Sequence, residues 1–200
     1  SGNNNPLIKD FLPLADLNDI VFGGWDVFPD SAYEAAARAE VLKKENLEPI
    51  KDFLHTIKPM TAAFDQNYVK RLSGPNVKTL TNKRELVEAL REDIRNKIKE
   101  TGASRAVMVW CGSTEIYISP QKVHMSLEAF ENGLDNNDPA IPPSSLYAYA
   151  AIKEGVAYAN GAPNLSADFP ALVELAEKEG VPIAGKDFKT GQTLMKTILA

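Results

Sequence analysis

The chain has 200 residues, of which 44% are hydrophobic and 24% are charged, and its formal net charge is −5. This composition is typical of globular proteins and excludes collagen, coiled coil and intrinsic disorder. No apolar run approaches the roughly 20 residues that a membrane span needs, and the acidic balance argues weakly against a nucleic-acid or anionic membrane surface. The first residues carry no secretory signal, so the cytoplasm is the expected location.

The first part of the chain reads as one strand followed by two helices. Residues 19–25, Asp-Ile-Val-Phe-Gly-Gly-Trp, form a short apolar run that ends in glycines, which is typical of a buried parallel strand opening into a loop. Ser31 and Glu34 have the spacing of a capping box, and they begin a helix predicted over 31–45. A second helix is predicted over 47–57, where the Lys-Pro pair that follows ends it.

The middle of the chain reads as helix, strand and helix. The longest helix spans 82–100, because its apolar residues recur every four positions, and Gly102 provides its C-terminal stop. Residues 105–110 form a second buried strand, which ends in Cys-Gly-Ser-Thr. A shorter helix is predicted over 126–133.

The last part alternates helices and strands again. The predicted elements are a helix capped by Ser144 or Ser145 that ends at Glu154, a strand over 156–159, a helix from Asp168 to Gly180, and a strand over 181–184. Strands that alternate with helices indicate an α/β fold with a parallel sheet. In such sheets ligands bind beyond the carboxyl ends of the strands.

The candidate site therefore consists of the loops that follow the predicted strands, at 23–26, 111–115, 160–163 and 185–193. The last loop is the richest, because Lys186, Asp187 and Lys189 precede a helix whose N-terminus attracts anions; a solvated helix start with charged neighbours explains these residues equally well. Asp26 is placed to accept hydrogen bonds from ribose hydroxyls, although by itself it is better interpreted as a turn aspartate. There is no G-x-G-x-x-G, so spacing alone selects no reaction.

Cysteine and histidine chemistry is sparse in this sequence. Cys111 is the single cysteine, and His55 and His124 are the two histidines, so no disulfide and no metal site are expected. We interpret both histidines as structural or surface residues. Cys111 ends an apolar strand without a cationic neighbour or helix start to activate it, and we predict a packed core thiol rather than a nucleophile.

At these loops the sequence resembles the myo-inositol-1-phosphate synthase (inositol-3-phosphate synthase) family. Four segments carry the resemblance in order and spacing: Gly24-Trp25-Asp26 with Tyr33-Glu34-Ala35-Ala36, Val109 to Glu115, Glu154 to Pro163, and Ile183 to Thr193. The last segment, with Gly-x-Asp-Phe-Lys-Thr-Gly-Gln-Thr, is the most diagnostic. The resemblance covers nearly the whole chain and implies a partial Rossmann-like parallel sheet with helices on both faces, without the family's first Gly-rich βαβ unit.

The resemblance also implies a reaction, an NAD-dependent conversion of D-glucose 6-phosphate to 1D-myo-inositol 3-phosphate by internal oxidation, enolisation, aldol closure and reduction in a cytoplasmic homotetramer. Residues 1–200 are then expected to be the central part of the NAD-binding domain, truncated at both ends, with the family's catalytic lysine cluster downstream. The isolated chain is expected to be inactive. The alternative, from a different class, is a non-catalytic NAD-binding-derived domain with a sensing or scaffolding role.

Functional positions of the family carry over residue by residue. The resemblance implies that the cofactor-binding residues are Asp26, Cys111, Gly112, Ser113, Thr114, Gly161, Ala162, Asp187, Thr190 and Gln192, and that the catalytic residues are Asp187, Lys189 and Lys196. The chain departs from the family pattern in having Cys111 for threonine, Ala162 for serine, Lys186 for an acidic residue and Leu194 for lysine. The last two changes put a direct role for Lys186 in doubt.

Overall fold

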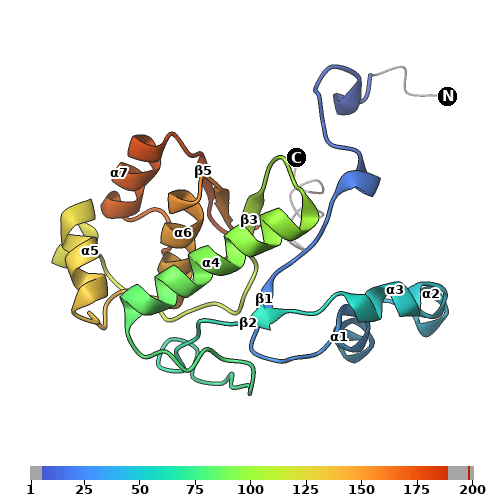
Figure 1. Cartoon of the computed structure of the whole chain (residues 1–200), viewed down its shortest axis with the longest axis horizontal. Coiled ribbons are helices and arrows are strands. Elements are labelled where there is room, and N and C mark those ends of the chain that lie inside the picture. The colour runs from blue at the N-terminus through green and yellow to red at the C-terminus, as the bar shows by residue number, and fades with distance from the viewer. Residues whose placement is uncertain (1–5, 189–197, 199–200) are drawn as a thin grey trace.

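The computed structural model describes residues 6–188 and 198, and its strands form two parallel sheets (Figure 1). The smaller sheet pairs β1 (Trp25–Asp26) with β2 (Met60–Thr61). The larger one has the order β3-β4-β5 and contains β3 (Val107–Trp110), β4 (Ala157–Asn160) and β5 (Ile183–Gly185). Parallel strands joined by helices confirm the predicted α/β fold class.

Seven α-helices lie in the described part of the chain: α1 (Ala32–Ala39), α2 (Lys44–Leu47), α3 (Lys51–Thr56), α4 (Lys83–Thr101), α5 (Leu127–Asp135), α6 (Pro143–Lys153) and α7 (Pro170–Glu179). Short 3-10 turns occur at Ile8–Asp10, Leu17–Asp19, Glu48–Ile50 and Lys122–His124. In Figure 1, β1 and β2 lie between the body formed by α4 to α7 and the separate group formed by α1 to α3. None of the described helices combines the length and apolar character needed to cross a bilayer.

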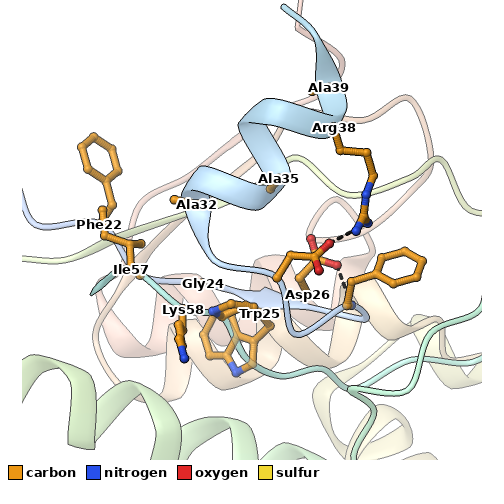
Figure 2. Close-up of a pocket in the computed structure, with 14 residues that line it drawn as sticks. Phe22, Gly24, Trp25, Asp26, Ala32, Ala35, Arg38, Ala39, Ile57 and Lys58 are labelled. Carbon is orange, nitrogen blue, oxygen red and sulfur yellow. Dashed lines mark hydrogen bonds and ion pairs between the residues drawn. The ribbon is translucent and has the colours of Figure 1, made fainter. Parts of the chain in front are cut away.

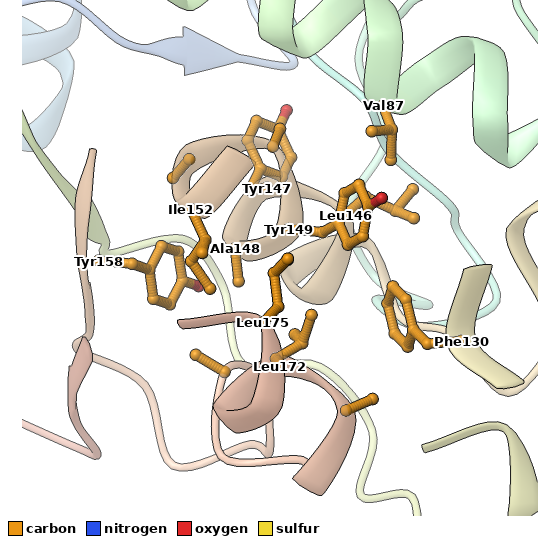
Figure 3. Packing of buried hydrophobic residues seen from close by; sticks show 14 of the residues in the cluster. Val87, Phe130, Leu146, Tyr147, Ala148, Tyr149, Ile152, Tyr158, Leu172 and Leu175 are labelled. Atoms are coloured by element: carbon orange, nitrogen blue, oxygen red, sulfur yellow. The ribbon is translucent and has the colours of Figure 1, made fainter. Parts of the chain in front are cut away.

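The core is built around α6, which is buried along 143–152 and is apolar on nearly every side. Helices α4 and α7 both pack against it, and Tyr158 of β4 joins the same cluster (Figure 3). Leu172 and Leu175 of α7 are completely buried there. Burial of each such leucine contributes about 1.5–3 kcal/mol, so this cluster stabilises the packing of α7 against α6.

The structure confirms the helix predicted over 82–100, which is α4, because the sequence signals that define this helix are local. Asn82 accepts a hydrogen bond from the amide N–H of Glu85 at 3.1 Å, and Gly102 ends the helix with φ 65°, a left-handed conformation that glycine adopts without strain. Leu90 and Ile94 are buried against the core.

The predicted strand over 19–25 is wrong except for its last residue. Only Trp25 belongs to β1, and Phe22 is 71% exposed. Within the described residues no strand pairs with 19–23, and Gly24 contributes only its carbonyl oxygen, which accepts from the amide N–H of Met60 at 2.8 Å. A parallel strand requires a neighbour along its length to satisfy its backbone groups. The partner of β1 is β2, a two-residue strand that the sequence analysis did not predict.

The two helices predicted over 31–45 and 47–57 are shorter than expected. Ser31 and Glu34 form the predicted capping box, but α1 ends at Ala39 because Glu40 adopts φ 53°. The second helix is divided at Pro49 into a 3-10 turn and α3, since proline removes a backbone donor from a helix interior.

Two predicted helix caps are also wrong, and prolines explain both. Ser144 and Ser145 lie inside α6 and are buried, and Pro143 is its first residue. Likewise α7 begins at Pro170, while Asp168 accepts a hydrogen bond from the amide N–H of Ser166 at 2.9 Å. Proline is favoured at the first helical position because its φ is preset and no N–H is needed there.

The strand predicted as buried over 105–110 is buried on one face only. Met108 and Trp110 pack against the core, whereas Val107 and Val109 on the opposite face are 67% and 46% exposed. Alternate residues of a strand point to opposite faces, so among the described residues the helical core covers the Met108 and Trp110 face.

Candidate functional site

The loops that follow β3, β4 and β5 are joined directly by backbone hydrogen bonds. The amide N–H of Gly161 donates to the carbonyl oxygen of Trp110 at 2.8 Å, which ties the β4 loop to the end of β3. The amides of Asp187 and Phe188 donate to the carbonyl oxygens of Ala162 and Gly161, both at 3.2 Å. The carboxyl ends of three parallel strands therefore present one continuous loop surface, the position at which α/β proteins bind ligands.

Two glycines make this close approach of the loops possible. A Cβ on Gly161 would lie 2.7 Å from the carbonyl oxygen of Trp110 and 2.5 Å from the ring of Phe188. Gly185 has φ 132°, and a Cβ there would lie 2.7 Å from the carbonyl oxygen of Asn160. Both positions require glycine, because any side chain would push the loops apart.

A buried carboxylate, Glu115, connects the β3 loop to the start of α6. Its two oxygens accept hydrogen bonds from the amide N–H of Ser144 at 2.9 Å and from the Ser144 hydroxyl. Asn164 of the β4 loop donates from its side-chain amide to Glu115 at 3.1 Å. Burial raises the pKa of Glu115 to about 7, against the lowering effect of the two Ser144 hydrogen bonds. Sequence analysis assigned Glu115 to the loop but gave it no role.

The β5 loop carries Asp187, which is exposed and has φ 59°. The neighbouring Lys186 forms an ion pair with Asp168 at 2.8 Å. The ion pair gives Lys186 a structural role that requires no contact with a ligand, which is consistent with its departure from the family pattern. The described part of this loop ends at Phe188, so Lys189, Thr190, Gln192 and Lys196 lie outside the described residues.

Beside β1 there is an open pocket of about 520 Å³. Its surface is mostly apolar, with Ala32, Ala35 and Ala39 of α1 along one side (Figure 2). Asp26 is one of the lining residues and is exposed, and one of its carboxylate oxygens accepts from the amide N–H of Phe28 at 2.9 Å. The lining further includes Phe22, Gly23, Gly24, Trp25, Phe28, Asp30, Arg38, Ile57, Lys58 and Pro59.

Asp93 of α4 holds β1 on the body of the protein. One of its carboxylate oxygens accepts from the indole N–H of Trp25 and from the ammonium of Lys78, both at 2.8 Å. The Trp25 ring meets the edge of Tyr147 with centroids 5.2 Å apart, and Tyr147 lies 5.4 Å from the Trp110 ring. This row of aromatic rings connects β1, which carries Asp26, to the end of β3.

The predicted site residues are partly brought together. Gly161, Ala162 and Asp187 meet through the backbone bonds above, and the segment from Cys111 to Thr114 is exposed at the end of β3. Asp26 belongs to the other sheet and is linked to them through the aromatic row. Ala162 is buried, and its amide N–H and carbonyl oxygen are bonded to Asn160 and Asp187. The predicted packing of Cys111 is wrong: its thiol is exposed, because the chain leaves the sheet after Trp110.

The prediction that His124 is a structural or surface residue is confirmed, and its role is structural. Its Nδ1 accepts from the amide N–H of Gln121 at 3.0 Å, so Nε2 carries the proton and donates to the carbonyl oxygen of Ala140 at 3.0 Å. The ring is completely buried and stacks on Phe169, and burial lowers its pKa. In the part of the chain that is described, no group of three His, Cys, Asp or Glu side chains is arranged to hold a metal ion.

The donor and acceptor groups of the pocket and loops fit a dinucleotide. Apolar walls suit a nucleobase, and the exposed Asp26 carboxylate suits hydroxyl donors of a ribose. The pocket volume lies within the range of small-molecule sites. The Arg38 guanidinium is already paired with Asp30 at 2.6 Å, whereas Asp26 and Lys58 are further charged groups in the lining.

Comparison with known proteins agrees with this geometry. An NAD-binding family model described as myo-inositol-1-phosphate synthase matches residues 1–200. Over 199 residues the chain is 56% identical to inositol-3-phosphate synthase 1 of Bacteroides thetaiotaomicron, covering 99% of this chain and 46% of that protein. It is 36% identical to inositol-3-phosphate synthase of Trypanosoma brucei brucei, covering 95% and 37%. The chain thus spans less than half the length of these relatives.

A solved structure agrees over almost the whole chain. Inositol-3-phosphate synthase from Caenorhabditis elegans superposes with a TM-score of 0.89 at 32% identity, covering 94% of this chain and 37% of that one. A myo-inositol-1-phosphate synthase-related protein from Thermotoga maritima, 22% identical with a TM-score of 0.55, shares the fold over 86% of this chain and 44% of its own. The chain therefore belongs to the myo-inositol-1-phosphate synthase family, and it is an NAD-binding α/β domain of that family.

Proposed function

We propose that residues 1–200 are the central part of the NAD-binding domain of an enzyme that converts D-glucose 6-phosphate to 1D-myo-inositol 3-phosphate. The observation that carries the proposal is the 56% identity to a protein named inositol-3-phosphate synthase 1, which extends over 99% of the chain and includes every site loop. The joined strand-end loops support it, because they form a ligand surface where the fold is expected to have one.

The residues of this chain bind and orient the cofactor in this proposal. Asp26 accepts hydrogen bonds from the ribose hydroxyls of the adenosine, and the exposed segment from Cys111 to Thr114 lies along the cofactor together with Gly161 and Ala162. Asp187, Thr190 and Gln192 line its nicotinamide end. When bound, NAD supplies a store for the hydride that is taken from the sugar and later returned.

The chemistry on the sugar is assigned to charged groups of the last loop and of the protein beyond this chain. Asp187 acts beside the reacting carbon at the nicotinamide end, and the ammonium groups of Lys189 and Lys196 stabilise developing negative charge on oxygen. A lysine cluster downstream of this chain completes the site and binds the phosphate. The isolated chain is accordingly inactive, because groups that act as a unit are lost together.

The assembly and location follow the family. The full-length protein is a cytoplasmic homotetramer, with glucose 6-phosphate as its small-molecule partner and without a nucleic-acid or membrane partner. The acidic net charge of −5 supports the absence of a nucleic-acid or membrane partner. The similarity to proteins named as inositol-3-phosphate synthases supports the substrate, the assembly and the location.

An activity assay on the full-length protein tests the proposal. It is incubated with glucose 6-phosphate and NAD, inositol phosphate is assayed, and the same preparation stripped of NAD serves as control. We expect product only with NAD, and none from the 200-residue chain. NAD binding without turnover would favour the alternative of a non-catalytic NAD-binding domain, and turnover by the isolated chain would contradict the placement of the catalytic lysines.

A further inference from the structure

Glu115 differs from the rest of the β3 loop in its environment. The four residues before it are exposed, whereas Glu115 is only 4% exposed. Its carboxylate receives three hydrogen bonds, two from Ser144 and one from the side-chain amide of Asn164, and its own amide N–H donates back to the Asn164 side-chain oxygen at 3.3 Å. The contact between Glu115 and Asn164 is thus reciprocal and joins the β3 loop to the β4 loop.

The chain of hydrogen bonds continues from Asn164 to the residues that are proposed to meet the cofactor. The carbonyl oxygen of Asn164 accepts from the side-chain amide of Asn160 at 2.8 Å. The side-chain oxygen of Asn160 then accepts from the amide N–H of Ala162 at 2.9 Å. Glu115 is therefore connected to Ala162 through buried groups that have specific partners.

Ser144 gives this carboxylate a second function, because Ser144 lies in the first turn of α6. The first amides of a helix have no partner within the helix, and the N-cap residue of α6, Pro142, offers no side-chain acceptor. Glu115 accepts from one of these amides and places its negative charge at the positive end of the helix. The central helix of the core is thereby attached to the β3 loop.

We propose that Glu115 is a positioning residue, which locks the β3 and β4 loops to each other and to the start of α6 in the arrangement that binds NAD. The proposal rests on the proposed function for the identity of the ligand. Glu115 itself is buried beneath the loops and does not contact the cofactor in this account.

Ionisation of Glu115 should weaken this lock. The three neighbouring donors favour the ionised carboxylate, but burial disfavours its charge more strongly and raises the pKa of Glu115 to about 7. Opening of the loops would expose Glu115 to water and remove this burial, so the closed arrangement binds the proton more tightly and the loops should bind NAD more tightly below that pH than above it. The charged and titratable groups that face Glu115 are Asp65, Tyr68, Lys83, Tyr147 and Tyr158.

The test measures the NAD dissociation constant of the full-length protein by calorimetry over roughly two pH units centred on 7. In the wild type we expect affinity to fall as pH rises. Glu115→Gln should bind about tenfold more weakly than the wild type at low pH, with a flat profile that assigns the step to Glu115 rather than to its charged neighbours. Ser144→Ala keeps the amide N–H but loses the hydroxyl that favours the ionised form, so its midpoint should move upward. Glu177→Gln, an exposed change on α7, is the matched control.

Hydrogen exchange of the cofactor-free protein is a second readout that requires no NAD. Glu115→Gln should exchange faster than the wild type over 111–116 and 160–166, with α5 unchanged. Unchanged exchange, or a pH step in NAD affinity that persists in Glu115→Gln, would overturn the proposal. If Glu115→Gln does not fold, the pH midpoint of NAD affinity in Ser144→Ala tests the proposal instead. A Ser144 hydroxyl with only a structural role would leave this midpoint at the wild-type pH, and that result would overturn the proposal. A wild type that binds no NAD at any pH refutes the proposed function, and the exchange comparison then decides the lock alone.

Discussion

Removal of the Asp93 carboxylate should release β1 from α4. One oxygen of Asp93 accepts from both the indole N–H of Trp25 and the ammonium of Lys78 at 2.8 Å. The Lys78 and Asp93 side chains are 13% and 23% exposed, so Asp93→Ala leaves a largely buried ammonium and an indole N–H without their acceptor. Because Trp25 precedes Asp26, the change should also displace the proposed ribose acceptor.

The expected loss of stability lies between two limits. Exposed ion pairs contribute about 0–1 kcal/mol, whereas breaking a fully buried pair costs about 3–5 kcal/mol. Because Asp93 is partly exposed and both lost hydrogen bonds involve a charged acceptor, we expect Asp93→Ala to lower the free energy of unfolding by about 2–4 kcal/mol. For a chain of this size that is a fall in Tm of roughly 4–16 °C.

Denaturant unfolding followed by circular dichroism measures this loss without relying on the fluorescence of Trp25. Asp93→Asn should be intermediate, because its amide oxygen still accepts but carries no charge. Glu100→Ala is the matched control on the same helix, since it removes a partner of Lys97 that is 70% exposed and should cost no more than about 0.5 kcal/mol. A loss in Asp93→Ala no larger than in this control would refute the anchoring role.

Four other changes should separate binding, chemistry and stability. Asp26→Asn keeps an acceptor for the amide N–H of Phe28 but lacks the charge for ribose hydroxyls, so calorimetry should show NAD binding about tenfold weaker at an unchanged Tm. Asp187→Ala should lower the turnover of the full-length protein but leave its Tm nearly unchanged, because the residue is exposed. A fall in Tm large enough to explain the lost activity would contradict this. Cys111→Thr should keep substantial activity, and complete loss with an intact fold and normal NAD binding would show that the thiol is a nucleophile. Burial raises the pKa of Glu115 from 4.5 to about 7, so the folded state binds more protons between these values; stability relative to Glu115→Gln should fall as pH rises through this window, and parallel pH curves would contradict the shift.

The elements that sequence predicts best are those whose signals lie within a few residues. α4 follows from its four-residue apolar repeat, from Asn82 three residues before Glu85, and from Gly102 at its end. The strand over 19–25 fails for the opposite reason, because an apolar run does not reveal whether a neighbouring strand is present. Pro143 and Pro170 are local signals for the true starts of α6 and α7. The prediction missed them because nearby serine and aspartate residues were interpreted as the helix caps.

The candidate site was predictable in its loops but not in the bonds that hold them together. Small-residue loops after strands indicate the ligand edge of an α/β sheet, and the described loops meet there. Glu115 was missed because its partners Ser144 and Asn164 are 29 and 49 residues away. The burial of Glu115 and the exposure of Cys111 depend on where the chain leaves the sheet, which residue type alone does not indicate.

The central claim, that the loops after β1, β3, β4 and β5 bind NAD, is tested most directly by hydrogen exchange of the full-length protein with and without NAD. We expect slower exchange on NAD addition at 24–28, 111–115, 160–164 and 185–188, with α5 unaffected. Protection confined to other segments, with these four unchanged, would contradict it.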